Sequence, residues 1–300
     1  TPRVQDKLGL NFAKLQERFP RLIHASLTGF GLTGSRSDHP CYDLIAEGYS
    51  GIMDLTGESE NDPQKVGTPA ADMLAGQDLA MAVMAAIHGR ARTGKGSSID
   101  ISMLSTMTRF TAPRVVAYLG SDEVPRRSGG KDSVIAIYQV FNTADAQLSL
   151  GLGNDAIWKR FWQAVGDTAF AEKPEYAGNA GRRTHRPAIV ARISEVLATK
   201  PRDEWLTLFA KNRIPAGPIN RVDEVTKDQD LLTKEFFYKS DSGYGEVPQV
   251  GLGITIDGTH HVHRKAPPTL GEDTEAILRE RLKLSPAQIA QLQQAKIVNK

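Results

Sequence analysis

Cysteine is nearly absent from the sequence, since Cys41 is the single thiol in 300 residues. One cysteine excludes an intrachain disulfide and any metal site that needs several thiolate ligands. This cysteine content is typical of a reducing compartment, so we expect a cytoplasmic protein.

Long apolar runs and an excess of one charge are lacking as well. No apolar run approaches the roughly 20 residues that span a bilayer, and no signal-peptide pattern opens the sequence. The 37 basic and 35 acidic residues are interspersed and give a net charge of +2. The sequence therefore favours a small-molecule partner over nucleic acid or a membrane.

Strand and helix patterns alternate through the first hundred residues. Strands are predicted at 22–27 and 99–104, and helices at 42–53 and 72–88. Five apolar side chains of the second helix can share one face: Leu74, Leu79, Val83, Met84 and Ile87. Both helices are expected in the core of an α/β layer fold with parallel strands.

A cluster of turn-forming and charged residues after Tyr118 predicts a linker to a second unit. The second unit is predicted to contain two strands followed by several helices, and a mixed tail begins near Val222. The predicted strands are 135–141 and 146–152, and the predicted helices are 158–165, 188–197, 202–211 and, at the end of the tail, 286–295.

The segment GFGLTG has the glycine spacing of a dinucleotide-binding turn, with Gly29, Gly31 and Gly34 directly after a strand. In such a turn the third glycine opens a helix whose amides hold the pyrophosphate. Here Pro40 delays the next helix to about Tyr42, so an ordinary turn is favoured.

The segment GRARTGKG, residues 89–96, is similar to a phosphate-binding loop. Gly96 stands where such a loop needs Ser or Thr, and the segment leads from helix to strand instead of from strand to helix. We interpret it as a solvated basic turn.

Three histidines near the C-terminus, His260, His261 and His263, raise the question of a metal. No acidic or thiol ligand nearby completes a set, and alternation along a strand accounts for the spacing. No metal is expected.

Several stretches together resemble one known family. They are RLIHASLTGFGLTG, CYDLIAEGYSGIMDLTG, VGTPAADMLAG, RTGKGSSIDISML, YQVFNTADAQLSLGLGNDAIWKRF, DEWLTLFAKNRIPAGPINRVDEV and APPTLGEDTEAIL. In this order they are similar to the family III CoA-transferases, also called the CaiB/BaiF family, over nearly the whole chain.

The resemblance implies an α/β fold with a Rossmann-like large domain and a smaller α+β domain. It implies a large domain at 1–120, a linker at 121–133, a small domain at 134–221 and a C-terminal return to the large domain at 222–300. Members usually begin with about a hundred further residues that supply much of the CoA pocket, so the large domain is expected to be N-terminally incomplete.

The resemblance further implies a catalytic role for Asp72 in GTPAADMLAG, as the carboxylate that carries the acyl group. Coenzyme A is then a substrate, no cofactor is permanently bound, a small organic acid is the acceptor, and the subunits form an interlocked homodimer. Taken alone, an aspartate at this place is an ordinary helix N-cap. Both roles can coexist, with first-turn amides holding an oxyanion.

Tyr42 and Asp43 match positions of the CoA and acyl pocket, and Gly129 and Gly130 match a mobile glycine loop. A core aromatic at a helix start and simple turn glycines are the alternatives. Racemases of the same fold have histidine where Tyr42 stands, and a tyrosine with an ordinary pKa near 10 is a poor proton shuttle at neutral pH. His39 keeps a 2-methylacyl-CoA racemase open as an alternative, as is an inactive acyl-CoA-binding relative.

Overall fold

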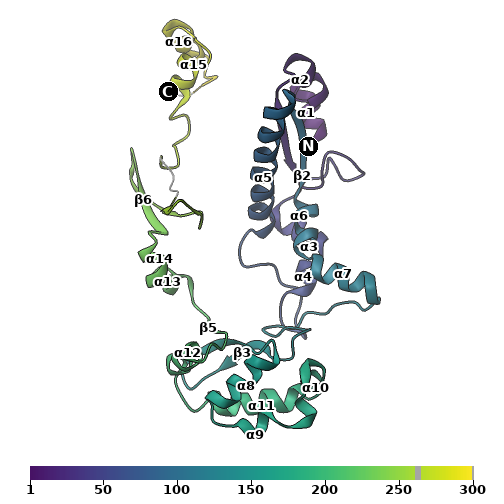
Figure 1. The fold of residues 1–300 in the computed structure, drawn as a ribbon. Helices are drawn as coiled ribbons and strands as arrows, with labels where there is room; N and C mark the ends of the chain where they lie inside the picture. The colour runs from purple at the N-terminus through teal and green to yellow at the C-terminus, as the bar shows by residue number, and fades with distance from the viewer. Residues whose placement is uncertain (261–264, 299–300) are drawn as a thin grey trace. The chain divides into compact units, whose positions relative to one another are not determined.

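The chain forms two compact units, residues 1–218 and 219–300. The computed structural model, drawn in Figure 1, describes residues 1–260 and 265–298, and each unit is described by itself. His261 and His263 lie outside the described residues. The finer division into 1–120, 121–133, 134–221 and 222–300 stays a prediction.

A pair of parallel strands organises the first part of unit 1. β1 (Ile23–Thr28) pairs in register with β2 (Ser97–Ser102), from Ile23 opposite Ser97 to Thr28 opposite Ser102. Helices α1 (Pro2–Leu8) and α2 (Phe12–Arg18) precede β1, and α3 (Asp43–Ser50), α4 (Ile52–Leu55) and α5 (Ala70–Thr93) connect the strands. The predicted alternation and the parallel pairing are confirmed.

The expected helix at 42–53 is divided in two. Gly51, at φ 80°, adopts a left-handed conformation that ends α3 and starts α4. Only a residue without Cβ takes this conformation at little cost, so the glycine sets the break.

Helix α5 has 24 residues and is less buried than the sequence predicts. Its buried residues are Ala70, Ala71 and Ala75, whereas Met84 and Ile87 are largely exposed. Two strands are too narrow to cover a full face of so long a helix. By length and composition alone α5 is also long and apolar enough to cross a membrane, which corrects the expectation from apolar runs. Core helices of soluble proteins pass the same test.

A small core holds α3, α5 and α6 (Met103–Phe110) together, and α7 (Ala112–Ser121) follows. Ser102 ends β2 and accepts a hydrogen bond from the Ser105 amide at 2.9 Å, which caps α6 and ends the predicted strand two residues early. The buried core residues are Ala46, Ala70, Ala71, Ala75, Met103 and Met107.

The second part of unit 1 is an antiparallel sheet of three strands with helices on it. Its strands run in the order β3 (Tyr138–Asn142), β4 (Gln147–Gly151) and β5 (Ala216–Pro218). The helical segments are α8 (Asp155–Ala164), α9 (Thr168–Ala171), η1 (Pro174–Tyr176), α10 (Gly178–Thr184), α11 (Arg186–Leu197) and α12 (Arg202–Lys211). Aromatic residues, including Trp158, Phe161, Trp162 and Phe209, fill the core between them.

Unit 2 consists of short elements. Its helices are α13 (Val222–Val225), α14 (Gln229–Thr233), α15 (Thr274–Glu280) and α16 (Pro286–Gln294), and its strands are β6 (Phe237–Ser242), β7 (Gly245–Val250), β8 (Thr255–Ile256) and β9 (Thr259–His260). β6 pairs with β7 and β8 with β9, each pair antiparallel.

Candidate active site

Asp72 is the third residue of α5, and it is not the N-cap. The helix begins at Ala70 with Pro69 as its N-cap, which offers no side-chain hydrogen bond. The interpretation of Asp72 as a capping residue is therefore wrong. The side chain is exposed and makes no hydrogen bond or ion pair with any residue that the structure describes. It stands in the first turn, where the positive end of the helix dipole favours an anion.

Asp43 supplies the cap that Pro69 cannot. One oxygen of its carboxylate, Oδ1, accepts hydrogen bonds from the Ala71 amide at 2.7 Å and from the Asp72 amide at 3.2 Å. Asp43 thereby fixes the backbone from which the Asp72 side chain projects. The expectation that first-turn amides hold an oxyanion fails for these two amides, because Asp43 already occupies them.

Glu47 lies beneath this arrangement and was not singled out from the sequence. It stands one turn after Asp43 on α3 and has an exposed fraction of 0%. Its Oε2 accepts a hydrogen bond from the Val66 amide at 2.9 Å. The sequence signal that could have found it is the like-charged pair Asp43 and Glu47, four residues apart on one helix face.

Tyr42 is the N-cap residue of α3 and makes no capping hydrogen bond with its side chain. It is 83% exposed, so the interpretation as a core aromatic is wrong. Its role in a substrate pocket stays a prediction. His39 is exposed, and the centroid of its ring lies 6.2 Å from that of the Phe30 ring in a T-shaped arrangement.

The single thiol lies near both carboxylates. Partial burial raises the pKa of Cys41, and the negative charges of Asp72 and Asp43 raise it further. A Cβ on Gly29 would collide with the Cys41 side chain, which explains why glycine follows β1 there. The nearest helix begins only at Asp43, so GFGLTG has no helix for a pyrophosphate.

The segment GRARTGKG, residues 89–96, forms the turn that the sequence predicts. α5 ends at Thr93, Gly94 caps it in a left-handed conformation at φ 72°, and β2 begins at Ser97. The segment thus leads from helix to strand, which excludes a phosphate-binding loop.

Gly129 lies against the turn after α4, and Gly130 lies against Val140 on β3. The Gly129 amide donates to the Gly57 carbonyl at 2.9 Å, and a Cβ on Gly129 would collide with the Glu58 carboxylate. A Cβ on Gly130 would lie 3.2 Å from Val140. The left-handed backbone of Gly129, at φ 62°, favours glycine there, and Gly130 has little room for a larger residue beside Val140. A role of either glycine in substrate binding stays a prediction.

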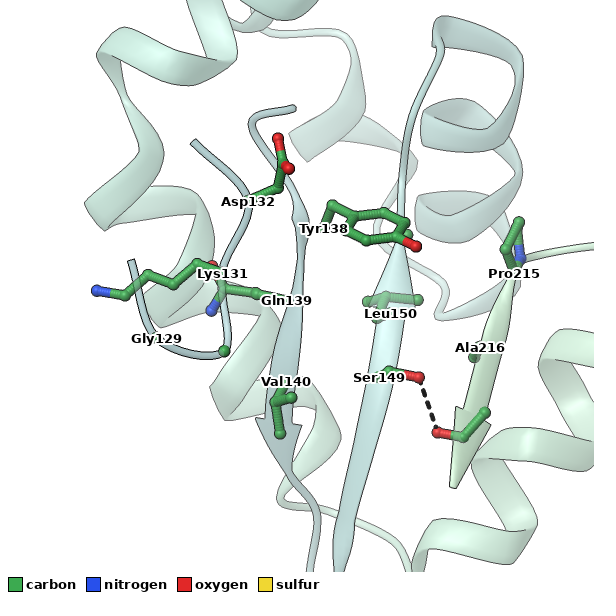
Figure 2. A pocket seen from close by; sticks show the side chains of 13 residues that line it. Gly129, Lys131, Asp132, Tyr138, Gln139, Val140, Ser149, Leu150, Pro215 and Ala216 are labelled. Carbon is green, nitrogen blue, oxygen red and sulfur yellow. Dashed lines mark hydrogen bonds between the residues drawn. The ribbon is translucent and has the colours of Figure 1, made fainter. Parts of the chain in front are cut away.

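A pocket of about 570 Å³ opens beside this loop (Figure 2). The Ser149 hydroxyl donates to the Gly217 carbonyl at 3.2 Å across β4 and β5, and the side chains of Lys131 and Tyr138 project in opposite directions. The residues that line the pocket are Gly129, Gly130, Lys131, Asp132, Tyr138, Gln139, Val140, Ser149, Leu150, Gly151, Pro215, Ala216 and Gly217. In the described ranges, no group of three or more His, Cys, Asp or Glu side chains is arranged to hold a metal ion.

The family model for CoA-transferase family III matches residues 1–274. The chain is 35% identical over 276 residues to a succinate–glutarate CoA-transferase of Agrobacterium fabrum, covering 91% of this chain and 69% of the relative. It is 31% identical over 281 residues to an acetyl-CoA:oxalate CoA-transferase of Acetobacter aceti, covering 93% of this chain and 71% of the relative.

Solved structures share the fold. A CaiB/BaiF family protein from Brucella suis superposes with a TM-score of 0.77 at 34% identity, over 94% of this chain and 72% of that one. The protein Rv3272 from Mycobacterium tuberculosis superposes with a TM-score of 0.80 at 23% identity, over 91% and 73% of the two chains. The expected α/β fold is confirmed, and the chain belongs to CoA-transferase family III, a class of CoA-transferring enzymes.

Proposed function

We propose that the protein moves CoA from an acyl-CoA donor to a carboxylic acid acceptor, with the Asp72 carboxylate as the covalent carrier. The observation that supports this most is the first turn of α5. Asp43 holds the backbone of Asp72 through two amides, while the Asp72 side chain stays exposed and without a partner among the described residues. A carboxylate on a backbone held in place, with its oxygens unpaired, is available to act as a nucleophile.

The proposed first step forms an anhydride. A carboxylate oxygen of Asp72 attacks the thioester carbonyl of the donor, so a C–O bond forms, the C–S bond breaks, and CoA leaves as a thiolate. The thiolate then attacks the aspartyl carbonyl of the anhydride, which releases the donor acid as a carboxylate and leaves CoA on Asp72 as a thioester.

The second half repeats these events with the acceptor. The acceptor carboxylate attacks the aspartyl thioester and expels CoA thiolate, which then attacks the acceptor carbonyl and regenerates the free Asp72 carboxylate. No net proton or electron is consumed. Water must be excluded during the reaction, because each anhydride is open to hydrolysis.

The proposed substrates are small organic acids, with dicarboxylates foremost. The names of two relatives support this range, since one is an acetyl-CoA:oxalate and the other a succinate–glutarate CoA-transferase. We also propose a cytoplasmic homodimer with interlocked subunits, in which the buried interface exceeds about 2,000 Å². Light scattering of the full chain should give the mass of a dimer, and an active monomer would contradict the assembly.

The nucleophile is tested by comparing Asp72→Ala and Asp72→Asn with Asp62→Asn, a matched change at an exposed loop carboxylate. The Asp72 variants should lose CoA transfer by several orders of magnitude and keep their melting temperature, whereas Asp62→Asn should resemble wild type. In the described part of the chain the Asp72 side chain makes no hydrogen bond or ion pair, so its loss should cost little stability, whereas loss of a covalent nucleophile removes the reaction path.

Hydroxylamine added during turnover should trap the activated carboxylate as a hydroxamate on the Asp72 peptide. An Asp72→Ala enzyme that kept more than about 5% of wild-type transfer would refute the covalent route. A chiral 2-methylacyl-CoA in heavy water should gain no deuterium at C2, because the transfer route abstracts no proton there.

A further inference from the structure

Glu47 is a buried residue, and among the residues that the structure describes only one of its two carboxyl oxygens has a hydrogen-bond donor. Oε2 accepts the Val66 amide at 2.9 Å, whereas Oε1 is shielded from solvent and has no hydrogen-bond donor in the described part of the chain. Asp43 stands four residues before Glu47 on α3, where side chains at this spacing are neighbours, and a hydrogen bond with Asp43 is among the causes that raise the pKa of Glu47. Two ionised carboxylates cannot hydrogen-bond each other, so this contact is favourable only if a proton lies between them.

Among the described residues, no lysine, arginine or histidine forms an ion pair with Glu47. Helix α3 packs against α4, α5 and α6, and the neighbouring core consists of alanine and methionine side chains. The charged groups on these elements and the preceding loop are already engaged or exposed. Asp54 pairs with Arg127, Asp78 pairs with Arg109, Asp72 projects outward, and exposed Lys65 donates to the Val66 carbonyl at 2.9 Å.

An ionised carboxylate buried without a paired cation is strongly unfavourable, and such groups usually take up a proton. We propose that Glu47 is a neutral carboxylic acid that donates a hydrogen bond to the Asp43 carboxylate. Asp43 in turn holds the Ala71 and Asp72 amides, so Glu47 is a positioning residue for the proposed nucleophile through Asp43. The catalytic part of this inference rests on the proposed function, whereas the protonation of Glu47 does not.

The electrostatics agree with this geometry. Burial raises the pKa of Glu47, the negative charge of Asp43 and its hydrogen bond raise it further, and the Val66 amide and Lys65 act in the opposite direction. A raised folded-state pKa gives a contribution to stability that is complete below the ordinary value of 4.5 and is lost as pH rises through the folded-state value. Above that value Glu47 and Asp43 would repel each other beside Asp72.

Glu47→Gln is the decisive variant, because a glutamine side chain reproduces the hydrogen bonds of the neutral acid. Its carbonyl can accept from the Val66 amide while its amino group donates to Asp43. Relative to wild type, Glu47→Gln should have equal stability below about pH 4.5. As the pH rises further, the folding equilibrium of Glu47→Gln should become more favourable than that of wild type by up to about tenfold per pH unit. This gain should stop once the pH passes the folded-state pKa of Glu47. Glu60→Gln, at an exposed loop position, is the matched control and should show no such pH-dependent gain.

Infrared difference spectra of the full chain at pH 7 give a direct reading. Wild type should show the carbonyl band of a protonated carboxylic acid, which shifts in heavy water and is missing in Glu47→Gln. Glu60→Gln should keep the band. Identical wild-type and Glu47→Gln spectra in this region, or identical stability profiles, would overturn the proposal.

Activity tests the positioning role. Glu47→Gln should transfer CoA within about twofold of wild type at pH 7 and keep its rate at alkaline pH, where the wild-type rate falls. Glu47→Ala removes both hydrogen bonds, and displacement of Asp72 should lower kcat by about ten- to a hundredfold with little change in KM. A Glu47→Gln enzyme as impaired as Glu47→Ala would refute the positioning role. An active Asp72→Ala enzyme would refute the proposed function instead, and it would leave the infrared and stability results unaffected.

Discussion

Replacement of Asp43 by alanine tests whether this carboxylate on α3 caps the N-terminus of α5. The variant leaves the Ala71 and Asp72 amides without their shared acceptor, at a helix start where Pro69 offers none. Losing a good cap costs about 1–2 kcal/mol, and hydrogen bonds to a charged acceptor place the loss near the upper end. We therefore expect a destabilisation of about 2 kcal/mol, or about 30-fold in the folding equilibrium.

Urea denaturation and thermal melting measure this loss, and a matched control lies nearby. Asp54 on α4 pairs with Arg127 at 2.9 Å, but its side chain is 61% exposed. Arg127 is 19% exposed but can keep its hydrogen bond to the Asp54 carbonyl at 3.1 Å in the alanine variant. Ion pairs with an exposed partner contribute about 1 kcal/mol or less, so Asp54→Ala should be the milder change. Asp43→Asn keeps an accepting oxygen and should fall between wild type and Asp43→Ala. An Asp43→Ala protein no less stable than Asp54→Ala would refute the capping role.

Two further comparisons concern packing. Gly96→Ala should destabilise unit 1 by about 1–3 kcal/mol in urea titrations, because its Cβ would collide with the Leu22 carbonyl beside the β1–β2 pair. Gly76→Ala, with open space in the middle of α5, should instead stabilise by up to about 1 kcal/mol, and equal effects would contradict this reasoning. Trp158→Phe should lower the free energy of unfolding by about 1–2 kcal/mol more than Trp162→Phe. The Trp158 indole donates a hydrogen bond to a backbone carbonyl at 3.2 Å and lies under a guanidinium group. The Trp162 indole nitrogen has no hydrogen-bond partner in the described chain. Equal losses in the same titrations would contradict that assignment.

Proline and capping residues in the sequence predicted the bounds of those helices that end or begin at such residues. The helix at 202–211 has the predicted bounds, because Pro201 precedes it and Trp205 and Phe209 bury one face. The final helix was placed to within one residue, with Pro286 at its first position after the Ser285 cap. Proline and capping signals act within one turn, so the sequence alone can show them.

Boundaries set by distant residues could not be predicted in this way. α5 begins two residues before the predicted start because Asp43, 29 positions from Asp72, accepts its first-turn amides. The burial of Glu47 depends likewise on the Val66 amide, 19 positions away. The resemblance to a known family named Asp72 and Asp43, but the hydrogen bonds that join them are tertiary, and no local pattern encodes them.

The three-stranded sheet also bears on how the chain folds. β5 pairs with β4 although Ser149 and Gly217 are 68 positions apart, with all the helices from α8 to α12 between them. Closing a loop of this length carries an entropic cost that only the packed helices offset. We therefore expect the third strand to join the sheet only as the helices pack, so that this part of unit 1 folds slowly and cooperatively. A nascent chain that has not yet reached Ala216 would expose the edge of β4, which is the stage most open to aggregation.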